Sequence, residues 1–197
     1  MISTGTTLVI GSVVLVTVGA WVSRSLRSAL VLAPFRILQR SEVHRLLTAG
    51  WVHADVTHLL FNMLTLYVFA DRVGGTLGTA SFVALYVSAV VVAFVPSTLI
   101  HLRDPKYSSL GASGAVSAVL ISAVLLHPGI RVGVPFVPVA VPGLLYALGY
   151  LVYSAVHAAL SNDGVNHEAH FAGAVYGALF TYALAPNHVV GALKHLW

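Results

Sequence analysis

The chain has 197 residues, of which 58% are hydrophobic and 8% charged, and its formal net charge is +4. Soluble domains carry about one quarter charged residues. The composition therefore excludes an ordinary soluble protein and predicts one membrane domain over residues 1–197, without a separate soluble domain. The chain has no cysteine, which excludes disulfides, thiolate metal sites and a cysteine nucleophile.

Apolar stretches long enough to approach a bilayer span recur along the chain. Because lipid offers no partner for backbone N–H and C=O groups, we expect these stretches to be helices. The first has no Lys or Arg before it, which favours a retained span over a cleaved signal peptide. The predicted fold is an all-α, polytopic bundle of six transmembrane helices, at about residues 6–22, 55–70, 80–100, 111–127, 142–160 and 168–186.

The first loop, at about residues 23–53, mixes arginines with apolar residues at near-helical spacing. This pattern predicts an amphipathic segment that lies in the membrane interface. Five of the ten basic residues lie between Arg24 and Arg45. Such a cluster suits lipid headgroups better than nucleic acid, so we expect membrane lipids and no nucleic acid as partners. Turn-forming residues separate the later spans at about 127–143 and 161–168.

Polar side chains within the predicted second span need an explanation, because polar groups are costly in a bilayer. His58 and Asn62 are four residues apart and therefore share one helix face, and His53 lies just before the span. They could serve a functional site. They could equally hold neighbouring helices together by hydrogen bonds.

The motif "GASG" places Ser113 between Gly111 and Gly114, in a segment of small residues. A serine in such a segment is often a packing contact, although small neighbours also let a substrate backbone approach. Nucleophilic attack by a serine requires a base to take its proton, and neutral histidine is suited to this near pH 7. The predicted last span supplies His170.

His170 lies on one stripe of its predicted helix with Gly173 and Gly177, a pattern typical of closely packed helices. Glycines on both helices would let the histidine come within hydrogen-bond reach of the serine. Two acids precede the histidine, but a helix turns about 200° over two residues, so Glu168 would face away from it. We therefore favour a Ser-His dyad, and interpret Asp163 and Glu168 as solvated loop residues.

From Glu42 to Gly177 the chain resembles the rhomboid intramembrane serine proteases, through "HADVTHLLFNM", "GASGA" and "AHFAGAVYG" in that order. The resemblance implies a serine endopeptidase without cofactor or metal, which cleaves transmembrane segments of membrane proteins. It implies Ser113 as nucleophile and His170 as general base. His58 and Asn62 would stabilise the oxyanion, together with the Ser113 N–H. In a supporting role, His53 would form hydrogen bonds in the nearby loop.

The resemblance also matches Arg45 to the arginine of the family's first-loop motif. It implies a multi-pass protein of a prokaryotic plasma membrane with both termini in the cytoplasm, whereas the distribution of basic residues between loops favours the opposite orientation. One departure concerns Ser117, at a position where these proteases commonly carry an aromatic residue that packs on the histidine.

Two other functions compete with proteolysis. A catalytically silent rhomboid-like protein could bind transmembrane clients, although such proteins usually lack the serine or the histidine. A metal enzyme could use some of the ten histidines, but the chain contains no H-E-x-x-H motif.

Overall fold

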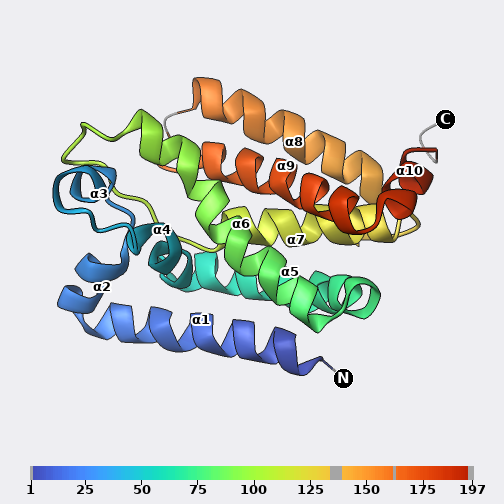
Figure 1. Ribbon diagram of the computed structural model, residues 1–197, viewed down its shortest axis with the longest axis horizontal. Helices are drawn as coiled ribbons and strands as arrows, with labels where there is room; N and C mark the ends of the chain where they lie inside the picture. The colour runs from blue at the N-terminus through green and yellow to red at the C-terminus, as the bar shows by residue number, and fades with distance from the viewer. Residues whose placement is uncertain (1, 134–138, 162, 195–197) are drawn as a thin grey trace.

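The computed structural model describes residues 2–133, 139–161 and 163–194. Within them the chain forms a bundle of helices, in which α1 and α8 lie on opposite sides and α5, α7 and α9 lie between them (Figure 1). The elements in chain order are α1 (Thr4–Val22), α2 (Arg24–Leu30), α3 (Pro34–Arg40), α4 (Arg45–Thr48), the 3-10 helix η1 (Ala49–Trp51), α5 (Val56–Leu77), α6 (Thr79–Ile100), α7 (Ser113–Leu126), β1 (Arg131–Gly133), β2 (Ala140–Pro142), α8 (Gly143–Leu160), α9 (His167–Leu184) and α10 (Pro186–Lys194).

Each of the six predicted apolar stretches coincides with a helix: α1, α5, α6, α7, α8 or α9. Among the described residues, α1, α6 and α8 are long and apolar enough to cross a membrane. Helix α7 is apolar but has 14 residues, fewer than the roughly 20 that a span requires. The helical membrane fold is therefore confirmed, and the count of six spans stays a prediction.

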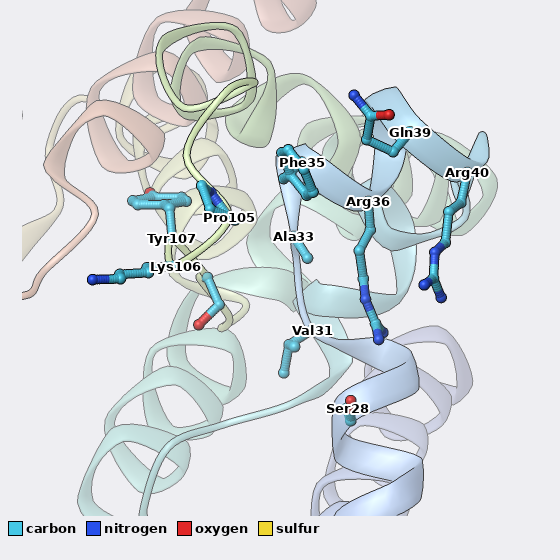
Figure 2. A pocket seen from close by; sticks show the side chains of 11 residues that line it. Ser28, Val31, Ala33, Phe35, Arg36, Gln39, Arg40, Pro105, Lys106 and Tyr107 are labelled. Carbon is cyan, nitrogen blue, oxygen red and sulfur yellow. The ribbon is translucent and has the colours of Figure 1, made fainter.

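The predicted amphipathic first loop contains three short helices and a 3-10 turn instead of one continuous helix. Pro34 begins α3, and Ser41 ends it in the left-handed conformation with φ of 56°. Helix α3 and residues 105–108 enclose a cavity of about 440 Å³, here called the first-loop cavity (Figure 2).

A short antiparallel hairpin precedes α8, where the sequence predicted only a connection. Arg131 pairs with Pro142, and Val132 pairs with Val141. Val132 is buried, so the hairpin adds an apolar side chain to the core. Residues 134–138 of the predicted connection, like residue 162 of the next one, lie outside the described residues.

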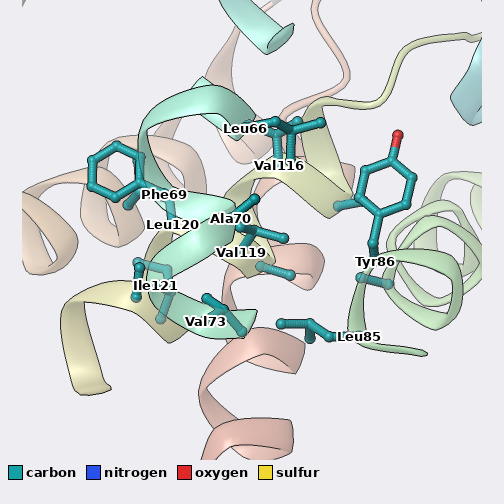
Figure 3. Close-up of a cluster of buried hydrophobic side chains, with 14 of the residues drawn as sticks. Leu66, Phe69, Ala70, Val73, Leu85, Tyr86, Val116, Val119, Leu120 and Ile121 are labelled. Carbon is teal, nitrogen blue, oxygen red and sulfur yellow. The ribbon is translucent and has the colours of Figure 1, made fainter. Parts of the chain in front are cut away.

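Helix α7 forms the centre of the bundle, and its residues from Gly114 to Leu126 are all buried. In Figure 3, Val119 of α7 lies among apolar side chains such as Leu66 of α5 and Leu85 of α6. Helix α9 packs along another side of α7. Because α7 is surrounded by protein, its apolar side chains form part of the core of the bundle.

The beginning of α7 lies below the end of one neighbouring helix, α6. A Cβ added to Gly114 would collide with the Cβ of Ala93, so these two residues mark one level of the bundle. From Ala93, α6 continues to Ile100, which is about 10 Å at 1.5 Å per residue. Ser113, the first residue of α7, thus lies about that far below the end of α6.

Candidate active site

The backbone before α7 presents Ser113 at a helix N-terminus. Gly111 has a φ of +118°, a conformation that favours glycine. A side chain there would also contact His58, because an added Cβ would lie 2.6 Å from its Cε1 atom. The Gly111 N–H donates to the Ala49 carbonyl over 2.9 Å. This turn aligns the serine with α7, whose first N–H groups have no acceptor within the helix.

Ser113 and His170 meet across the interface between α7 and α9. The Ser113 Oγ and the His170 Nε2 are 2.7 Å apart, although the residues are 57 positions apart in sequence. This distance is that of a hydrogen bond. The bundle therefore joins a hydroxyl and an imidazole in the geometry that proton transfer requires.

Small residues allow α7 and α9 to approach this closely. A Cβ added to Gly173 would collide with the carbonyl oxygen of Gly114, and one added to Gly177 with the carbonyl oxygen of Ala118. On α7, a Cβ added to Gly114 would lie 2.9 Å from the carbonyl oxygen of Ala169. Any larger residue at these glycines would push the two helices apart.

A cavity of about 690 Å³ opens beside the serine and the histidine, and is here called the active-site cavity. His58, Ser113 and His170 line it together with apolar groups such as Phe61 and Val165.

His58 and Asn62 share one face of α5 beside this cavity. The Asn62 Nδ2 donates one hydrogen bond to the His58 carbonyl over 3.1 Å, and an amide carries a second N–H. Asp55 caps the helix by accepting from the His58 N–H over 2.8 Å. Asn62 is buried and, unlike His58, is not among the described residues that line the cavity.

His53 lies behind Ser113 and supports the loop that leads to it. Its Nε2 accepts from the Ala112 N–H over 3.4 Å, so the proton of the neutral ring is on Nδ1, which lies 3.0 Å from the Thr17 Oγ1. The Thr17 hydroxyl in turn donates to the Trp51 carbonyl. Burial, with His58 nearby, lowers the pKa of His53 to about 3, which keeps the ring neutral and able to accept from Ala112.

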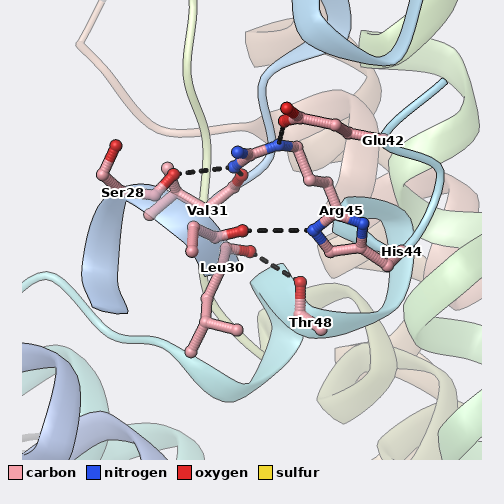
Figure 4. A network of polar contacts seen from close by, with 8 residues as sticks. Ser28, Leu30, Val31, Glu42, His44, Arg45 and Thr48 are labelled. Carbon is pink, nitrogen blue, oxygen red and sulfur yellow. Dashed lines mark hydrogen bonds and ion pairs between the residues drawn. The ribbon is translucent and has the colours of Figure 1, made fainter. Parts of the chain in front are cut away.

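Arg45 lies apart from the active-site cavity and holds the first loop together (Figure 4). Its guanidinium donates to the Glu42 carboxylate over 2.6 Å and to the carbonyls of Ser28 and Val31 over 2.8 Å each. The Arg45 charge lowers the pKa of Glu42. The arginine thereby ties the end of α2 to α4.

The two acids before His170 make different contacts. The Asp163 carboxylate lies 3.1 Å from the Nε2 of His167, not against His170. Hydrogen bonds from the Val165 N–H and from His167 lower the pKa of Asp163 to about 2. Within the described residues, neither Asp163 nor Glu168 forms a hydrogen bond to His170.

Tyr150 of α8 is a residue near the dyad that the sequence did not single out. The Ser117 Oγ donates to the Ser113 carbonyl over 2.7 Å and lies 2.6 Å from the Tyr150 hydroxyl. The Ser117 hydroxyl has one proton, which it donates to the Ser113 carbonyl. The Tyr150 hydroxyl is therefore the donor of the second bond. The Tyr150 and His170 rings are nearly parallel, with centroids 6.3 Å apart. An aromatic ring from α8 therefore lies beside the histidine.

Asn166, which caps α9, is a second residue that the sequence did not reveal. Its Oδ1 accepts from the Ala169 N–H, and its Nδ2 lies 3.0 Å from the hydroxyls of both Ser97 and Ser109. Ser109 also pairs with Leu32 of the first loop through two backbone hydrogen bonds. This amide thus joins the helix of His170 to the segment that leads to Ser113. The sequence signal that could have indicated this residue is its position at the start of a helix, where asparagine is a favoured cap.

A recessed hydroxyl and imidazole pair within a bundle of apolar helices is the architecture of a membrane-embedded protein with a hydrolase-like site. Comparison with known proteins gives the family: the model of the Rhomboid domain matches residues 40–187. The chain belongs to the rhomboid family.

Several curated rhomboid proteins are similar to the chain. RHOMBOID-like protein 12, mitochondrial, of Arabidopsis thaliana is 26% identical over 70% of this chain and 45% of the relative. Presenilin-associated rhomboid-like protein, mitochondrial, of Mus musculus is 31% identical over 67% of this chain and 36% of the relative. The chain thus spans less than half the length of these relatives.

These relatives correct the expected location. RHOMBOID-like protein 6 of Arabidopsis thaliana, 35% identical over 41% of this chain and 25% of the relative, is also named as mitochondrial. The expectation of a prokaryotic plasma membrane with cytoplasmic termini is therefore wrong. The relatives point to a mitochondrial membrane, which sequence patterns that describe only the fold could not distinguish.

Proposed function

We propose that the chain is an intramembrane serine endopeptidase that hydrolyses peptide bonds in or near transmembrane segments of other membrane proteins. The observation that carries this proposal is the 2.7 Å distance between the Ser113 Oγ and the His170 Nε2. Membership in the rhomboid family, which includes intramembrane proteases, supports it.

In the proposed mechanism, the Ser113 Oγ attacks the carbonyl carbon of the scissile peptide bond while His170 takes the hydroxyl proton at Nε2. The protonated histidine then donates to the leaving amine as the C–N bond breaks. Water, activated by the same histidine, hydrolyses the acyl-enzyme and releases the new carboxylate. A dyad suffices for these steps because His170 acts as base and acid in turn.

The negative charge on the tetrahedral intermediate needs donors that are already oriented. We assign this role to the N–H of Ser113 at the start of α7, the second Asn62 N–H and the His58 ring. The Asn62 amide is buried beside the cavity and does not line it, so its free N–H would reach the oxyanion only after the side chain turns toward the cavity. His53 and Arg45 act as positioning residues, through the Ala112 N–H and the first loop respectively.

The recessed serine restricts which substrates can react. A helical peptide hides its carbonyls within its own hydrogen bonds, so a transmembrane substrate must unwind before its backbone can enter the active-site cavity. We therefore propose that substrates carry helix-destabilising residues near the cleaved bond. Under this proposal six helices span the membrane around the reaction. They are α1, α6 and α8 together with α5, α7 and α9.

A fluorophosphonate probe, which reacts covalently with activated serines, tests the proposal on the detergent-solubilised protein. We expect labelling of the wild type and none of Ser113→Ala or His170→Ala, with cleavage of a transmembrane reporter lost in parallel. Ser81→Ala is a matched control, because Ser81 of α6 is not among the described residues that line the active-site cavity and the variant should keep both activities. Cleavage that persists in Ser113→Ala would refute the proposal. Unlabelled but folded wild type would favour a silent client-binding protein.

A further inference from the structure

The first-loop cavity differs in chemistry from the active-site cavity. Helix α3 contributes Arg36, Gln39 and Arg40 to one wall, and the segment after α6 contributes Lys106 and Tyr107 to the other. Figure 2 shows the side chains of Arg36 and Arg40 extending from α3 in the same direction, toward Ser28. Two guanidinium groups therefore lie beside about 440 Å³, whereas the Lys106 side chain extends away from them on the other side of the cavity (Figure 2).

The positive charges of Arg36 and Arg40 are offset only in part by the protein, because the nearby Glu42 carboxylate, on which both charges act, is already bound to Arg45. Arg36 and Arg40 are four residues apart on one helix, a spacing at which like charges repel. The nearest carboxylate in sequence, that of Glu42, is bound to the Arg45 Nε at 2.6 Å and does not line the cavity. Among the described residues, none forms an ion pair with Arg36, Arg40 or Lys106. An anion in the cavity would relieve this repulsion.

The surroundings of the cavity favour an anion that belongs to a lipid. The same loop exposes the apolar side chains of Leu26, Leu38 and Val43, which is typical of a segment whose apolar face contacts acyl chains. Val31 and Phe35 add apolar surface to the cavity itself. A phospholipid would satisfy both kinds of surface at once.

We propose that the first-loop cavity binds the phosphate of an anionic phospholipid headgroup, with Arg36 and Arg40 as its principal donors. Planar guanidinium groups match phosphate oxygens, two N–H groups to one phosphate. The backbone of Lys106 and the Tyr107 side chain form part of the opposite wall. The site is separate from the dyad, so its existence does not depend on the proposed proteolysis.

The test measures retained lipid. The full chain is reconstituted in nanodiscs of phosphatidylcholine with or without phosphatidylglycerol, extracted into detergent and analysed by native mass spectrometry. We expect phosphatidylglycerol to be retained on the wild type. Arg36→Gln/Arg40→Gln should lower its apparent affinity at least about tenfold, because two charge-assisted contacts are lost.

A charge-matched control separates a site from general attraction. Arg24→Gln/Arg27→Gln removes the same charge from α2, whose arginines do not line the cavity, and should keep phosphatidylglycerol bound. Circular dichroism verifies that both variants fold. The proposal would be overturned if both variants lost phosphatidylglycerol equally, or if both retained it equally. The proposal would also be overturned if inorganic phosphate stabilised the protein as strongly as phosphatidylglycerol does. The ligand would then be a free anion and not a lipid.

Discussion

Tyr150 and Ser117 form a pair that links α8 to the backbone of the nucleophile. The tyrosine hydroxyl donates to the serine hydroxyl, which donates to the Ser113 carbonyl. Because the rings of Tyr150 and His170 are also neighbours, one side chain borders both members of the dyad. The small residue at 117 thus leaves room for an aromatic ring from another helix.

Removing this hydroxyl pair should weaken the active site measurably. We expect Tyr150→Phe and Ser117→Ala each to slow fluorophosphonate labelling of Ser113, with a coupling free energy of about 1 kcal/mol in the double-mutant cycle. Labelling rates and thermal unfolding of the four proteins give this coupling.

Tyr146→Phe is the control for that cycle. Tyr146 lies one turn earlier on α8, and its hydroxyl bonds to no described residue. If Tyr146→Phe slowed labelling as much as Tyr150→Phe does, the hydroxyl pair would have no special role.

At the scale of elements, the packing of α7 against α9 sets the distance between the serine and the histidine. The contact depends on backbone surfaces that meet directly at Gly173 and Gly114. Side chains could repack around a larger residue, but a backbone carbonyl cannot move without shifting its helix.

Gly173→Ala should therefore separate the dyad. We expect a loss of about 1–3 kcal/mol in unfolding free energy from overpacking, and a fall of about 100-fold in probe labelling from misplacement of His170. Labelling kinetics and thermal unfolding in detergent measure both effects.

Gly149→Ala in α8 provides the comparison. A Cβ at Gly149 meets nothing within 4 Å, and alanine is the better helix former, by about 0.5–1 kcal/mol. This variant should keep its labelling and be no less stable than the wild type. Equal damage in both variants would show that sensitivity to alanine is general and does not arise from the α7 and α9 contact.

The helices could be predicted from the sequence because each apolar run is bounded by turn formers or polar residues. The close contact of α7 with α9 was predicted from Gly173 and Gly177, which are four residues apart on one stripe of their helix with His170. The first loop was predicted less well, because its order depends on Arg45 reaching the carbonyls of Ser28 and Val31. Such long-range bonds leave no periodicity in the sequence.

Long-range contacts without a sequence pattern also explain which residues of the candidate site could not be predicted. Ser113, His170, His58 and Asn62 are polar within apolar runs, and this contrast identified them. Tyr150 is one of several tyrosines on an apolar helix, and only its contact with Ser117, 33 residues earlier, distinguishes it. Asn166 resembled an ordinary turn residue until its contacts with Ser97 and Ser109 were known.

At the scale of the whole molecule, the first loop is held together in part by an ion pair that responds to pH. The Glu42 pKa is lowered in the folded state by Arg45. The ion pair therefore stabilises the fold above the unfolded pKa of glutamate, about 4.3. That stabilisation is lost as the pH falls through the lowered folded value.

Glu42→Gln should consequently reduce the Tm at neutral pH, and the difference from wild type should shrink as the solution is acidified below about pH 4.3. Thermal unfolding across this range measures the effect. Glu168→Gln is the control, because Glu168 forms no ion pair with any described residue. A pH-independent difference between Glu42→Gln and wild type would contradict the assignment to the ion pair.

The separation of Ser113 and His170 along the chain has a consequence for biosynthesis. Chains are made from the N-terminus, so α7 is synthesised before α9. Under the proposed function, Ser113 has no base until α9 has packed against α7. A chain whose synthesis has not reached α9 would therefore be unable to cleave its neighbours, because the proposed chemistry begins only with the docking of a helix made late in synthesis.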